Sequence, residues 1–285
     1  MSELLKDKVV VITGAGQGLG RAYALHAANA GASVVVNDLN GETSQATADA
    51  IRHAGGSAIS CPGEVNAQGF GDHLMTQAIE SFGRLDGVVP NAGVLNAASL
   101  FDETSEHARK TVETNLMGTI EVGLAGARAL RAGGGGAIVL ITSGSRFGLL
   151  ESTTYGATKN AVASLCWGWA LEAAPFGIRV NAVSPMAQTP MTIGNVIQTT
   201  LLPEEIAPAV TYFLSDLSVD VTGQIMRIYE SGIGLYPEAR LVPHEVPGRN
   251  WTTERVAEAM STSLAKDLAP VGRSGELGSP AGQAR

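Results

Sequence analysis

The sequence predicts a doubly wound α/β fold, in which helices cover both faces of a seven-stranded parallel sheet. Short apolar runs alternate with longer segments of helical period along most of the chain. The runs are rich in valine and isoleucine and show little polar alternation, which is typical of strands buried on both faces. A strand–helix alternation of this kind forms a parallel sheet through right-handed crossovers.

Each element of this fold has a place in the sequence. Strands are expected at residues 9–13, 33–37, 58–61, 85–90, 137–142, 178–183 and 224–229. Helices are expected at residues 19–30, 42–54, 67–82, 106–131, 152–176 and 203–216. Such sheets bind ligands at the carboxyl ends of the strands, near the switch in strand order. We therefore expect the functional residues in the loops that follow the strands.

Composition divides the chain into three regions. Residues 1–236 are expected to form a single domain, with an irregular loop at 184–202 where a substrate lid would lie. Residues 237–268 are expected to be a C-terminal extension with one helix, capped by Thr252 or Thr253. Residues 269–285 are rich in Gly, Pro and Ser and are expected to be a disordered tail.

Charge and cysteine usage limit the function. A formal charge of -8 argues against a nucleic-acid-binding face. No apolar run is long enough to span a membrane, and the polar N-terminus leaves no room for a signal peptide, so a cytoplasmic protein is expected. Cys61 and Cys166 lack metal-ligand spacing. We therefore expect reduced thiols and no metal site.

A glycine-rich loop lies between the first expected strand and the first expected helix. It carries Gly14, Gly16, Gly18 and Gly20. Glycine lets the main chain turn sharply and approach a pyrophosphate, while the start of the helix offers unpaired N–H donors. Because the loop follows a strand and opens a helix, it favours dinucleotide binding over a tight turn without a ligand.

A carboxylate, Asp38, ends the second expected strand. It can accept hydrogen bonds from both hydroxyls of an adenosine ribose, and it would repel a 2′-phosphate. Gln17 inside the loop is neutral, and the nearby cation Arg21 lies on the helix, where it can face solvent. The pattern therefore favours NAD over NADP.

Tyr155 and Lys159 lie four residues apart at the start of an expected helix. Residues four apart share one helix face, so the ammonium can lie beside the phenol. A free phenol has a pKa of about 10, and a neighbouring positive charge favours the phenolate. On a chain expected to bind a dinucleotide, this pair can move a proton while hydride passes to or from the cofactor.

Together these motifs resemble the short-chain dehydrogenase/reductase family, whose fold is of the Rossmann type. The resemblance rests on "TGAGQGLG", Asp38, "NAG" at 91–93, "TNLMG" at 114–118, Ser143 and "YGATK" at 155–159. It implies that Tyr155 is the general acid/base and that Lys159 lowers its pKa and binds the nicotinamide ribose. It also implies that Ser143 hydrogen-bonds the substrate oxygen and that Asn115 holds a water that relays protons to Lys159. For Asn115, a helix-kink residue bonded to the neighbouring main chain is an alternative that is compatible with this role.

The same resemblance implies a set of cofactor-binding residues. They are Gly14, Gly16, Gln17, Gly18, Leu19, Gly20, Asp38, Glu64, Val65, Asn91, Ala92, Gly93, Tyr155, Lys159, Pro185 and Thr189. The chain departs from the family at three places near them. Pro90 stands where an asparagine is usual, Glu64 replaces an aspartate, and Met186 stands where Pro-Gly is usual. The loop to Thr189 is also one residue short.

The hydroxyl that accompanies Tyr155 has three candidates. The spacing from Ser143 to Tyr155 is one residue shorter than is usual in the family, so counting back from Tyr155 reaches Thr142 instead. Strand alternation favours Ser143, because loops absorb deletions more readily than strands do. Ser145 is the third choice. Arg146 in the same loop can meet an anionic substrate group or lie in solvent.

A closer resemblance indicates the substrate class. "GLGRAYAL", "VVVNDL", "LPEEIAPAVTYFLSD" and "WTTERVAEAM" are similar to the dehydrogenase region of type 2 peroxisomal multifunctional enzymes. This implies a 3-hydroxyacyl-CoA or hydroxysteroid-like substrate, and Met186, Met191 and Ile193 can form an apolar wall for it. A 3-oxoacyl-carrier-protein reductase and a catalytically silent dinucleotide-binding regulator are the alternatives. The family resemblance implies a homotetramer in which the two long helices, 106–131 and 152–176, pair across an interface.

Overall fold

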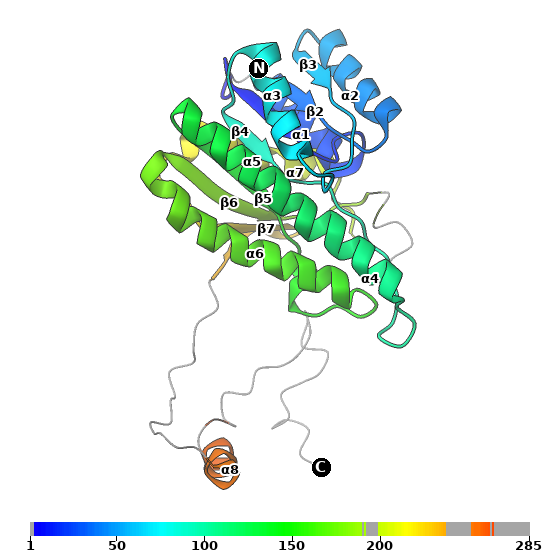
Figure 1. Ribbon diagram of the computed structural model, residues 1–285, viewed down its shortest axis with the longest axis vertical. Coiled ribbons are helices and arrows are strands. Elements are labelled where there is room, and N and C mark those ends of the chain that lie inside the picture. Colours follow the sequence, from blue (N-terminus) through cyan, green and yellow to red (C-terminus); the bar gives the residue numbers. More distant parts are fainter. Residues whose placement is uncertain (1–2, 190, 192–198, 238–251, 263, 265–285) are drawn as a thin grey trace.

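The computed structural model describes residues 3–189, 191, 199–237, 252–262 and 264 (Figure 1). They form an eight-stranded sheet of order β3-β2-β1-β4-β5-β6-β7-β8. The strands are β1 Val9–Ile12, β2 Ser33–Val36, β3 Ser57–Ser60, β4 Gly87–Val89, β5 Gly136–Ile141, β6 Ile178–Ser184, β7 Ile225–Tyr229 and β8 Gly232–Tyr236. Strand order reverses between β1 and β4, and this is the switch point at which such sheets bind ligands.

Seven strands are parallel, as predicted, with registers such as Val11 opposite Val35 in β1–β2 and Ile138 opposite Val180 in β5–β6. The eighth strand was not predicted. β8 pairs antiparallel with β7, placing Ile228 opposite Ile233. Its sequence, GIGLY, has two glycines and leaves Ile233 67% and Leu235 58% exposed, so it lacks the buried apolar run that identifies the other strands. The prediction of seven strands was therefore one short.

Helices cover both faces of the sheet. They are α1 Gly18–Asn29, α2 Gly41–His53, α3 Phe70–Phe82, α4 Ser105–Val112, α5 Gly118–Gly133, α6 Thr153–Ala173, α7 Pro203–Leu214 and α8 Thr253–Thr262. Buried residues of α1, α2 and α7, including Tyr23 and Phe213, share one core with one face of the sheet. Buried residues of α3, α5 and α6, including Val122 and Val162, share the other. In Figure 1, α5 and α6 lie across the face of the sheet that is turned toward the viewer.

The predicted long helix at 106–131 is interrupted. A π turn, η1 Glu113–Met117, separates α4 from α5, and the N–H of Gly118 donates to the carbonyl of Glu113 five residues earlier. Asn115 lies in this turn and is fully buried. π turns of this kind occur mostly as single insertions in α-helices, often at functional sites. The prediction of one continuous helix over 106–131 did not include this turn.

The C-terminal regions are only partly described. Thr252 caps α8, since its hydroxyl accepts the N–H of Arg255 at 3.3 Å, which agrees with one of the two caps predicted. Most of the expected extension at 237–268, and all of the expected tail at 269–285, lie outside the described residues. Among the helices that the structure describes, none has the length and apolar character needed to cross a membrane.

Candidate active site

The glycine-rich loop connects β1 to α1 at the switch point. Gly14 and Gly18 have φ values of 60° and 53°, which residues with a side chain rarely adopt. The other two positions leave no room. A Cβ on Gly16 would lie 2.3 Å from the Thr43 hydroxyl oxygen, and one on Gly20 would lie 2.1 Å from the Gly14 carbonyl oxygen. The main chain thus requires glycine at positions 14, 18 and 20, whereas at Gly16 the conflict is with the Thr43 and Asp38 side chains.

α1 begins in a way that leaves its first N–H groups available. Its N-cap residue, Gln17, makes no side-chain capping hydrogen bond. By contrast, Asn40 caps α2, where its side-chain oxygen accepts the N–H groups of Glu42 and Thr43. Unpaired N–H groups and the helix dipole make an uncapped N-terminus suited to an anion such as a pyrophosphate.

The Asp38 carboxylate is held by the main chain at the end of β2. One oxygen accepts the Gly16 N–H at 2.9 Å, and the other accepts the Asn40 N–H at 3.1 Å. Each oxygen keeps further acceptor capacity, because a carboxylate has about four lone-pair sites. The side chain lines the cavity, whereas that of Arg21 does not. A negative charge is therefore fixed at the entrance to the loop.

Asn37, which the sequence analysis did not single out, supports this end of the cavity. Its side chain is fully buried and donates to the carbonyls of Cys61 and Gly63 at 3.0 and 3.1 Å. These bonds tie the end of β2 to the loop that carries Glu64 and Val65. The sequence offered one signal for this role, because Asn37 is a polar residue at the end of an otherwise apolar strand.

Asn91 locks the loop after β4 onto the glycine-rich loop. Its amide donates to the carbonyls of Thr13 and Gly14 at 2.9 and 3.2 Å. In return the Thr13 hydroxyl accepts the N–H groups of Asn91 and Ala92 at 3.0 and 3.1 Å. Pro90 has no N–H to donate, but none of these hydrogen bonds uses an N–H of residue 90. The proline in place of the usual asparagine therefore leaves these hydrogen bonds intact.

Tyr155 and Lys159 lie in the first two turns of α6 at the opposite end of the cavity. The Lys159 ammonium donates to the Ile141 carbonyl at 2.9 Å and lies 5.7 Å from the centre of the Tyr155 ring. Lys159 is 4% exposed, and burial lowers its pKa to about 8. Burial raises the pKa of Tyr155 to about 12, while a hydrogen bond with Ser143 lowers it. The pair is thus desolvated and depends on nearby dipoles and charges for its ionisation.

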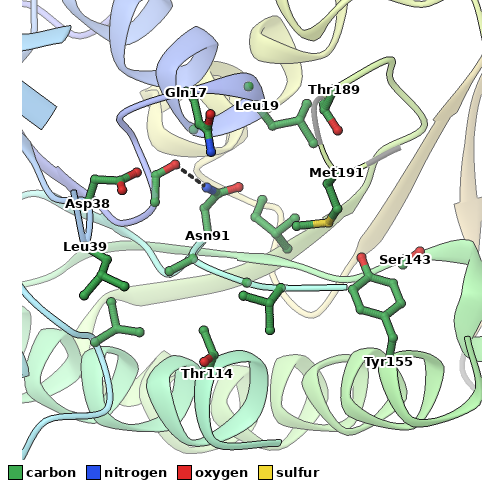
Figure 2. A pocket seen from close by; sticks show the side chains of 18 of the residues that line it. Gln17, Leu19, Asp38, Leu39, Asn91, Thr114, Ser143, Tyr155, Thr189 and Met191 are labelled. Carbon is green, nitrogen blue, oxygen red and sulfur yellow. Dashed lines mark hydrogen bonds between the residues drawn. The ribbon is translucent and has the colours of Figure 1, made fainter. Parts of the chain in front are cut away.

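The three candidate hydroxyls point in different directions. The Thr142 hydroxyl donates to the Lys159 carbonyl at 2.6 Å, so it is directed at the main chain of α6. The Ser143 hydroxyl lies beside Tyr155 and contacts the Ser145 hydroxyl at 3.1 Å (Figure 2). Ser145 is 2% exposed and lies outside the cavity lining. Thr142 and Ser143 both line the cavity, and of the three hydroxyls that of Ser143 is the one beside the Tyr155 phenol.

Asn115 bonds the main chain of the loop after β4. Its side-chain oxygen accepts the Val94 N–H at 2.7 Å, and its amide donates to the Val94 carbonyl at 2.8 Å. A Cβ on Gly93 would lie 3.2 Å from the Asn115 side-chain oxygen and 3.7 Å from the Lys159 ammonium. Asn115, Gly93 and Lys159 are therefore close neighbours. Of the two roles expected for Asn115, the structure shows the one in which its side chain bonds the neighbouring main chain.

One cavity of about 680 Å³ joins these groups (Figure 2). All of the predicted catalytic and cofactor-binding residues line it except Gly16 and Asn115. Asp38 and Leu39 are at one side and Tyr155 and Ser143 at the other. Thr189 lines the cavity despite the shortened loop, and so do Met186 and Met191. Ile193, the third residue of the expected apolar wall, lies outside the described residues.

Arg227 on β7 is a second residue that the sequence analysis missed. It is 7% exposed and donates to the carbonyls of Ser184 and Pro185 at 3.2 and 3.1 Å. It therefore fixes the chain where β6 ends and the loop to Thr189 begins. A charged residue inside the buried run IMRIY was the signal.

The arrangement suits a nicotinamide dinucleotide and acid–base chemistry. The glycine cradle fits a pyrophosphate, the fixed Asp38 carboxylate fits a diol, and the cavity ends at a tyrosine, a lysine and a serine. In the described part of the chain, no group of three or more His, Cys, Asp or Glu side chains is placed to hold a metal ion.

Comparison with known proteins gives consistent matches. The family profile described as short chain dehydrogenase matches residues 8–198. Cis-4-hydroxycyclohexanecarboxylate dehydrogenase of Sinomonas cyclohexanicum is 35% identical, over 80% of this chain and 97% of that protein. Peroxisomal multifunctional enzyme type 2 of Mus musculus is 33% identical, over 80% of this chain but 32% of that longer protein. A crystal structure of a short chain dehydrogenase from Mycobacterium avium superposes with a TM-score of 0.84, at 28% identity, covering 92% of this chain and 96% of the other.

Proposed function

The chain belongs to the short-chain dehydrogenase family, and from that premise we propose that it is an NAD-dependent dehydrogenase of secondary alcohols that have an apolar or CoA-linked body. Family membership implies an oxidoreductase that interconverts an alcohol and a ketone with a nicotinamide dinucleotide. The observation that carries the finer proposal is the single cavity, which has Asp38 at one end and Ser143, Tyr155 and Lys159 at the other.

The chain's own residues account for cofactor binding. The glycine-rich loop and the uncapped start of α1 would hold the pyrophosphate, and Asp38 would accept the two adenosine ribose hydroxyls. The chemistry that the bound nicotinamide ring supplies is acceptance or donation of hydride. Lys159 spends one N–H on Ile141, so two remain for the nicotinamide ribose.

The preference for NAD rests on the charge at Asp38. A 2′-phosphate would have to sit beside a carboxylate whose position is fixed by two main-chain N–H groups. Arg21, the nearby cation, does not line the cavity and so does not offset that repulsion there.

Proton transfer falls to Tyr155. In the direction of oxidation, its phenolate oxygen takes the proton of the substrate hydroxyl, while Ser143 donates a hydrogen bond to the same substrate oxygen. Burial raises the pKa of Tyr155, which stands at about 12 even with the lowering by the Ser143 hydrogen bond. The Lys159 ammonium and the hydrogen bond with Ser143 both favour the phenolate. Asn115 would hold the water that relays the proton onward from Lys159.

The substrate class follows from the rest of the cavity wall. Met186, Met191 and Val94 bring apolar surface to the tyrosine end, which suits a bulky lipid-like or cyclic alcohol. One of the two relatives compared above is named as the dehydrogenase of a hydroxylated cyclohexane ring, and the other as a peroxisomal multifunctional enzyme. A 3-hydroxyacyl-CoA or a hydroxysteroid combines a secondary hydroxyl with such a body.

We also propose a homotetramer. Among the described residues, each of the two long helices exposes one large apolar side chain, Leu124 on α5 at 43% and Leu171 on α6 at 80%. The proposal rests on family membership, which implies that the two long helices pair across an interface, where these leucines would be buried. Light scattering after gel filtration would measure the mass, and a monomer at micromolar concentration would contradict this part of the proposal.

The test of function is a substrate screen with both cofactors. NADH or NADPH formation would be followed by absorbance for 3-hydroxyacyl-CoA, hydroxysteroid and cyclohexanol substrates. We expect turnover with NAD and little with NADP. Asp38→Ala should reduce the preference for NAD over NADP by about tenfold, a change of about 1.4 kcal/mol. Cofactor binding without any turnover would contradict the proposal, and a preference for NADP in the unmodified protein would contradict its cofactor assignment.

A further inference from the structure

Arg146 lies three residues beyond Ser143, in the short 3₁₀ helix η2 Gly144–Phe147. The sequence left two interpretations open, an arginine that meets a substrate anion and a solvated one. The structure supports neither. Arg146 does not line the cavity, and it is partly buried, with its Nε shielded from solvent and without an acceptor. Burial lowers its pKa.

Aromatic rings from three elements surround this guanidinium instead. Its central carbon lies 4.3 Å from the ring centre of Phe147, 4.8 Å from that of Tyr236 and 5.9 Å from that of Trp167. Phe147 belongs to η2 itself, Tyr236 ends β8, and Trp167 lies on α6. The rings of Phe147 and Tyr236 also contact each other, with centres 5.0 Å apart. A partly desolvated cation over several ring faces is held more strongly than one in solvent.

A short and rigid piece of chain connects this cluster to the catalytic hydroxyl. Ser143 is the N-cap of η2, and its hydroxyl accepts the Ser145 N–H at 3.2 Å. The Gly148 N–H closes the helix on the Ser145 carbonyl at 3.1 Å. η2 is pressed against the start of α6, since a Cβ on Gly156 would lie 2.5 Å from the Ser145 carbonyl oxygen. A shift of the Arg146 end would therefore be passed to Ser143.

We propose that Arg146 is a positioning residue, which fixes the Ser143 hydroxyl against Tyr155 by anchoring η2 to Tyr236 of β8 and Trp167 of α6. This inference rests on the proposed function. In this arrangement β8, an edge strand distant in sequence from Ser143 and Tyr155, supports the catalytic end of the cavity. Trp167 lies twelve residues past Tyr155, which is about 18 Å along α6 at 1.5 Å per residue. The aromatic contacts of Arg146 therefore lie outside the catalytic site that they stabilise.

The first test compares Arg146→Met, Arg146→Lys and Arg131→Met. Arg131 is a matched control, because it also lies over a phenylalanine ring, that of Phe176, at 4.0 Å, but on α5 away from the cavity. We expect Arg146→Met to lower kcat about 10- to 100-fold, with the KM for NAD unchanged, and Arg146→Lys to recover part of the loss. Arg131→Met should leave kcat near that of the unmodified protein.

A pH profile separates positioning from general destabilisation. The hydrogen bond with Ser143 lowers the pKa of Tyr155, so loosening it should move the rise of kcat for oxidation to higher pH. Lys159 and Tyr23, the other titratable groups that interact with Tyr155, are unchanged in the variant. Ultraviolet difference titration of the tyrosines, referenced to Tyr155→Phe, reads the same shift without turnover. The titration therefore tests the inference even if the proposed function fails.

A second pair of variants keeps the test open if Arg146→Met does not fold. Tyr236→Ala removes the ring and Tyr236→Phe retains it, so only the first should reproduce the loss of kcat and the shift in pH. In the double variant Arg146→Met/Tyr236→Ala the two losses should not add, because both break one contact. Unchanged pH profiles in Arg146→Met and Tyr236→Ala, or effects equal to those of Arg131→Met, would overturn the inference.

Discussion

At the phosphate-loop end of the cavity the geometry is set by the main chain, whereas at the tyrosine end it is set by side chains. Gly20 has no room for a Cβ beside the Gly14 main chain, and main-chain N–H groups hold Asp38. At the other end, the ionisation of Tyr155 depends on Ser143 and Lys159, which come from different elements. The comparison teaches that one end should respond to substitution mainly in affinity and the other mainly in rate.

The largest expected effect is at the tyrosine end. Tyr155→Phe removes the group that carries the proton, and we expect kcat to fall by about 10³-fold or more. NAD affinity should be nearly unchanged, because the phosphate-loop end is intact. Stopped-flow or steady-state kinetics with fluorescence titration of NADH would measure both, and substantial remaining turnover would exclude Tyr155 as the acid/base.

The next effect distinguishes two adjacent hydroxyls. Ser143→Ala should lower kcat by about 10²- to 10³-fold, as the loss of a donor to a developing charge does. Thr142→Val is the matched control, since its hydroxyl bonds the Lys159 carbonyl rather than facing Tyr155. It should cost about 1 kcal/mol of stability and affect kcat much less. The reverse order of effects on kcat would show that Thr142 is the catalytic hydroxyl.

The third effect is on affinity at the phosphate-loop end. Gly20→Ala would place a Cβ 2.1 Å from the Gly14 carbonyl oxygen, so the loop must shift. We expect NAD binding to weaken at least about tenfold, which needs only about 1.4 kcal/mol, while kcat at saturating NAD changes little. Isothermal titration calorimetry would measure the affinity.

Gly168 supplies the control for this substitution. It lies within α6 and has no atom within 4 Å of an added Cβ. Gly168→Ala should leave NAD binding unchanged and should stabilise the protein by about 0.5–1 kcal/mol, as Ala does relative to Gly in a helix. Equal NAD affinities for the Gly20→Ala and Gly168→Ala variants would remove the steric argument.

The last effect is on folding rather than on activity, and it concerns the pH dependence of stability at the tyrosine end. Burial lowers the pKa of Lys159 from 10.5 to about 8, so between these values the unfolded state binds more protons than the folded state. The destabilisation is therefore full below about pH 8 and is relieved as the pH rises toward 10.5. It amounts to about 3 kcal/mol at 1.36 kcal/mol per pKa unit.

Urea unfolding of the unmodified protein and of Lys159→Met measures this linkage. As the pH rises through the window, the unmodified protein should gain stability relative to the variant. Comparing the two removes most of the contribution of Tyr155, whose raised pKa acts in the opposite direction above its ordinary value. A difference in stability that does not change with pH would show that Lys159 is solvated in the folded protein.

The same division explains what could be predicted from the sequence. The seven parallel strands and the glycine-rich loop follow from local patterns, because each depends on residues close together in the chain. β8 was missed because its glycines and exposed side chains give no buried run. The contacts of Asn37 and Arg227 depend on residues brought together only by the fold, and sequence spacing carries no record of them.

The π turn at Asn115 has a consequence for how this chain can change. A π turn is an α-helix with one residue too many, so deleting a single residue between 113 and 118 would restore regular hydrogen bonding from α4 through α5. The wider turn absorbs the extra residue, so the deletion would keep the faces of α4 and α5 nearly in place but would remove the bulge from which Asn115 reaches Val94. A single deletion would therefore give a more regular helix that no longer bonds the loop after β4 through Asn115.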